Sequence, residues 1–84
     1  MERFFTSGET HRLPADLRIR ALARLQQINM ANSTADLRLP TSNRLERLRG
    51  KRRGQWSIRI NKQWRVCFRF EGGDAFDVEI ADYH

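Results

Sequence analysis

Three alternating runs in the C-terminal half constrain the fold of this chain more than any other feature. Apolar side chains occupy every second position in each run, at 56–60, at 64–70 and at 76–80. The runs are separated only by the segments NKQ and EGGDA. A period of two is typical of strands with one buried face, and short polar connections favour hairpins. The sequence therefore predicts an antiparallel meander with one apolar face.

An amphipathic helix precedes the meander. Pro14 suits the first helical turn, and Asp16 suits the positive end of a helix. Four apolar residues then recur at helical spacing, namely Leu17, Ala21, Leu25 and Ile28. This pattern predicts a helix from Pro14 to Asn29.

The segment between the helix and the meander is less regular. Ser33 or Thr34 could cap a short second helix that runs through Leu37 and is stopped by Pro40. Residues 41–50 favour an irregular strand that leads into the loop GKRRG at 50–54.

The expected fold class is α+β, with N-terminal helices packed on one face of a small antiparallel sheet and the other face turned toward water. The chain has 84 residues, and this length predicts one domain, 1–84. It has no long apolar run and no signal pattern, and Cys67 is its only cysteine. We therefore expect a cytoplasmic protein without a membrane segment, in which Cys67 is a buried structural thiol.

The charge of the chain is strongly positive and unevenly distributed. The formal net charge is +6, with seven basic residues and one acid between 44 and 59. From residue 71 onward there are five acids and no Lys or Arg. Such segregation favours contact with a polyanion such as nucleic acid, although a basic loop that only aids solubility gives the same pattern.

Strand parity brings two arginines together on the face expected to meet water. If Ile60 lies opposite Trp64, then Arg59 lies opposite Arg65. Like charges directly across a ladder are unfavourable, and a phosphate bound between two guanidinium groups would relieve the repulsion. Alternatively, each arginine turns toward water or toward a nearby acid. The same parity pairs other residues across the second hairpin, namely Phe70 with Phe76, Arg69 with Asp77, and Cys67 with Glu79.

Further candidate residues adjoin this pair. We expect four basic residues to contact RNA: Lys51, Arg52, Arg53 and Lys62. Parity places Tyr83 on the same outer face, and its phenol, like the imidazole of His84, could transfer protons. Since the sequence shows no metal-ligand spacing, no P-loop and no dinucleotide fingerprint, we expect neither metal nor cofactor. A nuclease without metal would use the 2′-hydroxyl of RNA as nucleophile, with arginines stabilising the charge on the phosphate.

The segment 48–84 carries a family resemblance. Its motifs are G-x-W-S-I-R-I-N, Q-W-R-V-C-F-R-F, a glycine turn and the closing V-E-I-x-D-Y-H. They resemble the C-terminal half of HigB-type toxins in the RelE/ParE superfamily. A weaker similarity over 4–40, with FFTSG, a helix and D-L-x-x-P, follows the same order, so that nearly the whole chain is covered.

This resemblance implies a RelE-like microbial RNase fold and cleavage of messenger RNA in the ribosomal A site. It also implies a HigA-like helix-turn-helix antitoxin that neutralises the toxin and binds operator DNA. By motif, Arg65 and Tyr83 are the strongest catalytic candidates, followed by Arg59 and His84, with Lys51 to Arg53 as RNA-contacting charge.

Two features depart from the family pattern. Such toxins usually open with a short Ile-x-Ser-Phe strand before the part that resembles MERFF, and its absence predicts an open sheet edge. The basic loop contains no histidine, which leaves the general base unassigned. Two other functions remain open on the sequence: a ParE-like toxin that poisons DNA gyrase, and a nucleic-acid-binding module without catalysis.

Overall fold

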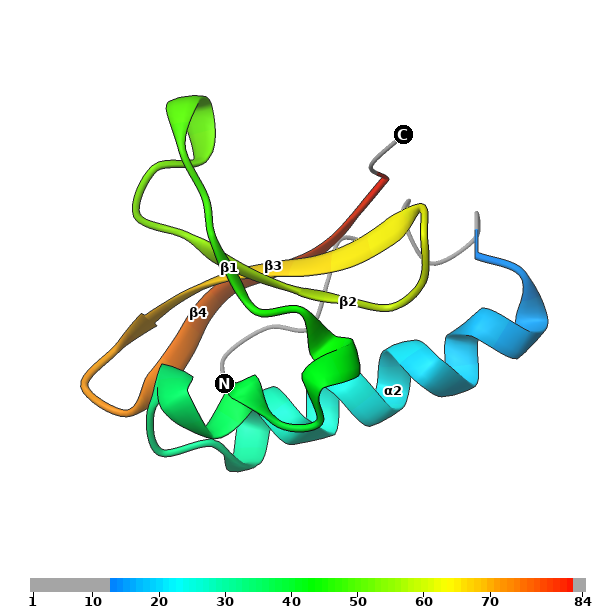
Figure 1. Cartoon of the computed structure of the whole chain (residues 1–84), viewed down its shortest axis with the longest axis horizontal. Helices are drawn as coiled ribbons and strands as arrows, with labels where there is room; N and C mark the ends of the chain where they lie inside the picture. The colour runs from blue at the N-terminus through cyan, green and yellow to red at the C-terminus, as the bar shows by residue number, and fades with distance from the viewer. Residues whose placement is uncertain (1–12, 83–84) are drawn as a thin grey trace.

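A computed structural model describes residues 13–82, in which one α-helix lies across one face of a four-stranded antiparallel sheet (Figure 1). The strands follow the order β1-β2-β3-β4, so that neighbours in the sheet are also neighbours in sequence. This arrangement confirms the expected α+β class and the RelE-like fold. The expected open edge concerns the start of the chain, which lies outside the described residues.

Helix α2 spans Ala15–Met30, within one residue of the predicted range. Its buried residues are the predicted stripe, Leu17, Ala21, Leu25 and Ile28. They join the apolar side chains of the sheet in a single core, because both faces are excluded from water when they meet. The helix therefore supplies one layer of the fold and the sheet the other.

Two short 3-10 helices connect α2 to the sheet. The first, η1, spans Thr34–Arg38, and the side chain of Asp36 accepts hydrogen bonds from the backbone N–H groups of Asn32 and Ser33. This segment matches the predicted short second helix. The second, η2, spans Thr41–Asn43 and replaces the start of the irregular strand expected at 41–50. The strand itself, β1, is limited to Glu46–Arg47.

The buried amide of Asn43 fixes η2 against the helix. Its Nδ2 donates to Gln27 Oε1 at 2.9 Å and to the carbonyl of Leu37 at 3.2 Å. These bonds position the chain that leads into β1 and hence one border of the site described below.

The meander consists of β2 (Trp56–Arg59), β3 (Trp64–Glu71) and β4 (Asp74–Asp82). In the first hairpin the predicted register is confirmed, with Trp56 opposite Phe68 and Arg59 opposite Arg65. The backbone N–H of Ile60 bonds to the carbonyl of Trp64, which closes the turn as expected. The pairing of Cys67 with Glu79 in the second hairpin is also confirmed.

The predicted register fails beyond Cys67. Phe76 lies opposite Arg69 rather than Phe70, and Phe70 lies opposite Ala75. A bulge between Cys67 and Arg69 explains the shift, since β4 supplies one extra residue there and Asp77 adopts a positive φ of 52°. The expected ion pair nevertheless forms, with Arg69 Nη1 3.8 Å from Asp77 Oδ2.

The outer face of the sheet is less exposed than predicted. Ser57, Arg65 and Cys67 alternate with the core residues of β2 and β3, yet all three are buried. For Cys67 this confirms the expectation of a buried thiol. For Arg65 the expectation of a water-exposed side chain is wrong, because its guanidinium is covered by contacts described in the next section. Within residues 13–82 no helix has both the length and the apolar composition that a membrane crossing requires.

The core predicts a clear contrast between two leucines of α2. Replacement Leu25→Ala should lower the free energy of unfolding by about 2–5 kcal/mol, because a fully buried side chain leaves a cavity. Leu22→Ala, at a position 57% exposed, should change it by less than about 0.5 kcal/mol. Urea denaturation followed by circular dichroism measures both, and equal losses would contradict this packing.

Candidate nucleic-acid interface

Arg65 is the charged residue held most deeply in the described sheet, with an exposed fraction of 8%. Its Nε donates to Ser57 Oγ at 2.7 Å, and its Nη2 donates to the carbonyl of Arg44. Its Nη1 lies 3.6 Å from Glu46 Oε1. The guanidinium therefore reaches from β3 past β2 to the segment that enters β1, where backbone and side-chain oxygens fix its plane.

These contacts leave part of the guanidinium available. Arginine carries five N–H donors in a planar fork, and two are used in the hydrogen bonds to Ser57 and Arg44. The carboxylate of Glu46 is more than half exposed and forms an ion pair without a hydrogen bond. An incoming anion could displace it without breaking the bonds that orient Arg65.

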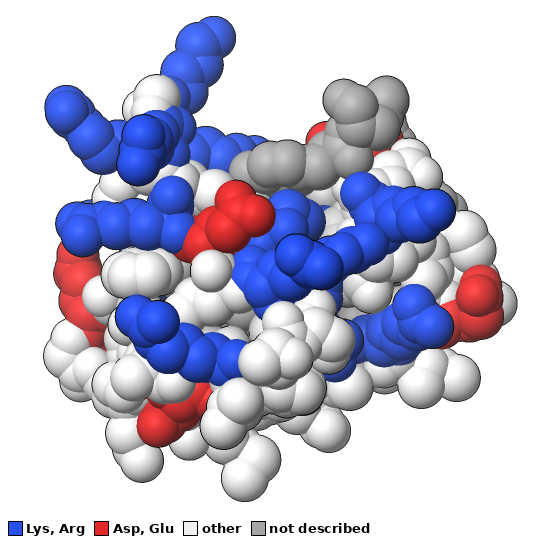
Figure 2. Space-filling view, in the orientation of Figure 1, with Lys and Arg blue, Asp and Glu red and all other residues white. Residues whose placement is uncertain are grey.

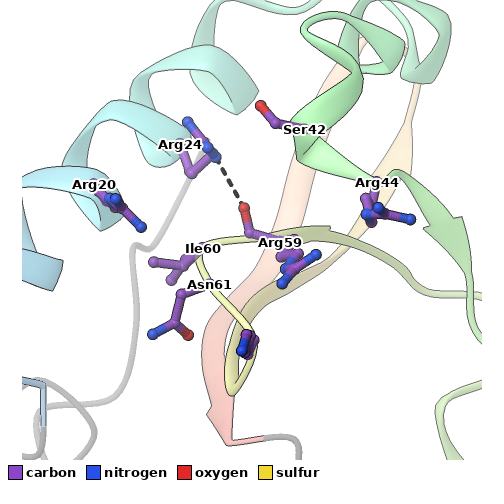
Figure 3. Close-up of a pocket in the computed structure, with 8 residues that line it drawn as sticks. Arg20, Arg24, Ser42, Arg44, Arg59, Ile60 and Asn61 are labelled. Atoms are coloured by element: carbon purple, nitrogen blue, oxygen red, sulfur yellow. Dashed lines mark hydrogen bonds between the residues drawn. The ribbon is translucent and has the colours of Figure 1, made fainter.

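Arg59, the cross-strand partner of Arg65, belongs to a different environment. Its side chain lines a pocket of about 590 Å³ between α2, η2 and the turn from β2 to β3 (Figure 3). Lys62 lines the same pocket, whereas Arg65 does not. The predicted pairing of Arg59 with Arg65 across the strands is thus confirmed. The two side chains belong to different surroundings, because Arg65 contacts the segment that enters β1 whereas Arg59 lines the pocket.

We call this hollow the arginine pocket. Its cationic lining residues are Arg20, Arg24, Arg44, Arg59 and Lys62. Arg24 Nε donates to the carbonyl of Arg59 at 2.9 Å, the bond that ties α2 to the end of β2 (Figure 3). Burial, followed by repulsion from Arg20, lowers the pKa of Arg24 from its ordinary value. The pocket therefore concentrates positive charge, with Arg24 and Arg59 partly buried and the other cations exposed.

The basic loop at 50–54 lies at the other end of β2. It contains the 3-10 helix η3, Gly50–Arg52. The first and last residues of the loop, Gly50 and Gly54, both have a positive φ. Lys51 and Arg53 are exposed, whereas Arg52 forms an ion pair with Glu79 on β4 and donates to Gln55 Oε1. Arg52 thus holds the loop against the sheet, and Lys51 and Arg53 present free charge.

The four residues predicted to contact RNA are therefore divided between two places. Lys51, Arg52 and Arg53 lie in the loop before β2, and Lys62 lies in the turn after it. Basic side chains extend over much of the face seen in Figure 2, with few acidic ones among them. The face as a whole could follow an extended polyanion.

Tyr83 and His84 lie outside the described residues. Strand β4 ends at Asp82, which pairs with Trp64 on β3, directly beside Arg65. Among residues 13–82 no group of three or more His, Cys, Asp or Glu side chains is arranged to hold a metal ion.

Sequence reasoning missed several residues of this interface. Alternation places Ser57 on the outer face of its strand without indicating its bond to Arg65, and Arg44 and Glu46 contribute to the sequence pattern only as charge. Arg20 and Arg24 carried a usable signal, since residues four apart share one face of a helix. The contribution of η2 depends on long-range contacts through Asn43 and leaves no local pattern in the sequence.

The helix-on-sheet architecture and its basic face define a RelE-like α+β protein. Residues 1–84 match the family described as the RelE-like toxin of the type II toxin–antitoxin system HigB. The chain therefore belongs to the HigB-like toxins of type II toxin–antitoxin systems.

Individual relatives agree with this family. The chain is 36% identical over 81 residues to "Toxin HigB-1" of Vibrio cholerae, covering 95% of this chain and 85% of that protein. It is 36% identical over 84 residues to "Endoribonuclease HigB" of Proteus vulgaris, covering 100% of this chain and 90% of that protein. A protein of Haemophilus influenzae is 36% identical over 80 residues, covering 93% and 78%.

The environment of Arg65 predicts a role for Ser57 in stability. Ser57→Ala should lower the free energy of unfolding by about 1–3 kcal/mol, because it leaves a donor of a buried guanidinium unpaired. The exposed hydroxyl of Ser42 provides the control, and Ser42→Ala should cost less than about 0.5 kcal/mol. Urea titrations of both variants test this, and an unchanged midpoint for Ser57→Ala would refute the described contact.

Proposed function

We propose that this toxin is an endoribonuclease that cuts messenger RNA on the ribosome, with Arg65 stabilising the phosphate at the position of cleavage. The observation that carries the proposal is the fixed guanidinium of Arg65, oriented by Ser57 and the carbonyl of Arg44 beside the end of β4. The relative from Proteus vulgaris, named an endoribonuclease and similar over the whole chain, supports it.

The proposed cleavage chemistry depends on the positive charge of Arg65, which is fixed in position before RNA binds. In metal-independent RNA cleavage the 2′-oxygen loses its proton and attacks the adjacent phosphorus, and the bond from phosphorus to the 5′-oxygen of the next nucleotide breaks. The products are a 2′,3′-cyclic phosphate and a 5′-hydroxyl that takes up a proton, and negative charge builds on the phosphate oxygens on the way. A preoriented guanidinium stabilises that charge without reorganising during the reaction. Tyr83 and His84, which directly follow β4 in the sequence, are proposed to transfer protons to and from the reacting oxygens.

Glu46 is a second proposed participant, because its carboxylate is the one found nearest the Arg65 guanidinium in the described part of the chain. A carboxylate at this position could accept the proton of the attacking 2′-hydroxyl. The basic loop lacks histidine, so Glu46 supplies a base where the sequence offered none.

The remaining basic residues are proposed to hold the RNA. Lys51 and Arg53 would contact phosphates on one side of the cleavage position, and Lys62 and Arg59 on the other. Arg52 would act by fixing the loop, since its guanidinium is committed to Glu79. Contacts of this kind are electrostatic and weaken as salt increases.

The family implies an antitoxin partner. We propose that it is a HigA-like protein with a helix-turn-helix domain that keeps the toxin inactive and brings the pair to operator DNA. Co-expression with that partner should restore growth and yield a co-purifying complex.

Induction of the chain in bacteria tests the proposed activity. Growth should stop, and primer extension should map cuts within translated codons. Arg65→Gln should abolish both effects, because it removes the fixed charge from the phosphate. Arg69→Gln is the matched control, since Arg69 lies on the same strand and is exposed in pairs with Glu71 and Asp77. Intact transcripts with broken DNA would indicate gyrase poisoning instead.

Replacement of Glu46 separates catalysis from binding. Glu46→Gln should slow RNA cleavage by about 10²-fold or more if the carboxylate is the base. It should leave RNA affinity unchanged or slightly increased, because a negative charge has been removed next to the phosphate site. Cleavage rates on programmed ribosomes and binding of an uncleavable RNA measure the two effects. An unchanged rate would remove Glu46 from the mechanism.

A further inference from the structure

Three residues of the arginine pocket, Arg20, Arg24 and Arg44, have no role in the function proposed above, in which only Arg59 and Lys62 of this pocket contact RNA. Five of its lining residues are Arg or Lys, and none is Asp or Glu. Two acids of the described sheet have basic partners outside the pocket, since Glu46 forms an ion pair with Arg65 and Glu79 with Arg52. Within residues 13–82, no carboxylate forms an ion pair with Arg20, Arg44, Arg59 or Lys62.

Like charges gathered in one hollow repel one another, and a bound anion would relieve that repulsion. Burial lowers the pKa of Arg24 in the first place, and repulsion from Arg20 adds to this effect. A guanidinium remains charged at neutral pH even so, and it matches the paired oxygens of a phosphate.

The walls of the pocket are held in place by hydrogen bonds within the protein. Arg24 ties α2 to the carbonyl of Arg59, and Asn43 ties η2 to α2. In the turn, Asn61 Oδ1 accepts the backbone N–H groups of Gln63 and Trp64. The amide N–H₂ of Asn61 is therefore left as a donor at the border of the pocket, next to the cations (Figure 3). A preformed site of this kind needs little reorganisation to bind an anion.

The pocket shares two residues, Arg44 and Arg59, with the immediate surroundings of Arg65. The side chain of Arg44 lines the pocket while its carbonyl accepts a hydrogen bond from Arg65. Arg59 lines the pocket and pairs with Arg65 across the ladder. In an RNA strand whose reacting phosphate lies at Arg65, a neighbouring phosphate would lie near the pocket.

From these observations we propose that the arginine pocket is a second anion site that holds a backbone phosphate of the RNA away from the bond that is cut. The proposal rests on the proposed RNase function and adds to it a positioning role for Arg20, Arg24 and Arg44. The volume of about 590 Å³ lies in the range of roughly 300–1,000 Å³ common for ligand pockets, which leaves room for a phosphate and its sugar.

The test uses the full chain and a short RNA in which every 2′-hydroxyl is methylated, so that binding is measured without cutting. The pocket variant is Arg20→Gln/Lys62→Gln, with one exposed charge removed from the helix wall and one from the turn. The control Arg18→Gln/Arg38→Gln removes two exposed charges that do not line the pocket. Fluorescence anisotropy over a series of salt concentrations gives the affinity and its salt dependence.

The pocket variant should bind about tenfold more weakly than the unaltered chain, and its slope of log K against log salt should be shallower by about 0.7 for one lost phosphate contact. The control should bind within about twofold of the unaltered chain, because exposed charges outside a site contribute only to the general field. Equal loss in both variants, or no binding by the unaltered chain, would overturn the proposal.

A polyglutamate peptide distinguishes RNA from an acidic protein segment. If the pocket variant loses the peptide but keeps the RNA, the pocket is a protein-docking site and the proposal is wrong. The cleavage assay separates the two levels of the account. If the unaltered chain cuts RNA and both variants bind RNA equally, the proposed phosphate site in the pocket is wrong and the proposed RNase activity stands. If RNA binding depends on the pocket but the chain does not cut RNA, the proposed RNase activity is wrong and the phosphate site stands.

Discussion

A single buried guanidinium, that of Arg65, organises the outer face of the sheet. Arg65 is the second residue of strand β3, whose other face is packed into the core. Its charge can be kept away from water only if oxygen atoms surround it. Ser57 on β2 and the carbonyl of Arg44 provide these oxygens, with Glu46 completing the charge balance. The short β1 segment is therefore held beside β2 by the contacts of Arg65 as well as by its two ladder pairs.

This constraint also explains why two basic sites lie next to each other. The carbonyl of Arg44, a residue with a positive φ of 46°, accepts a hydrogen bond from Arg65, and the same residue lines the arginine pocket. Arg59 is fixed by the ladder opposite Arg65, while its carbonyl anchors Arg24 on the helix. The helix packing that builds the core thus also brings its arginines to the end of β2.

The sequence predicted the regular parts of the fold well, because helical spacing around Leu25 and strand alternation around Val66 report burial directly. The predicted strand register is wrong at the bulge between β3 and β4. The positive φ of Asp77 there does not disturb the alternation of apolar and polar residues, so the sequence pattern does not reveal it. The sequence placed Arg65 and Arg59 opposite each other correctly, yet assigned both to open solvent. The covering of Arg65 and the wall formed by η2 depend on contacts between residues far apart in the chain, which a local pattern does not contain.

The most direct measurement places the purified toxin with ribosomes carrying a short messenger RNA whose cut position has been mapped. A single 2′-deoxynucleotide is then substituted on the 5′ side of the scissile phosphate. If Arg65 stabilises a phosphate attacked by the neighbouring 2′-hydroxyl, cleavage at that position should disappear while binding to the ribosome is retained. Continued cleavage of the substituted RNA, or no cleavage of the unmodified one, would contradict the account.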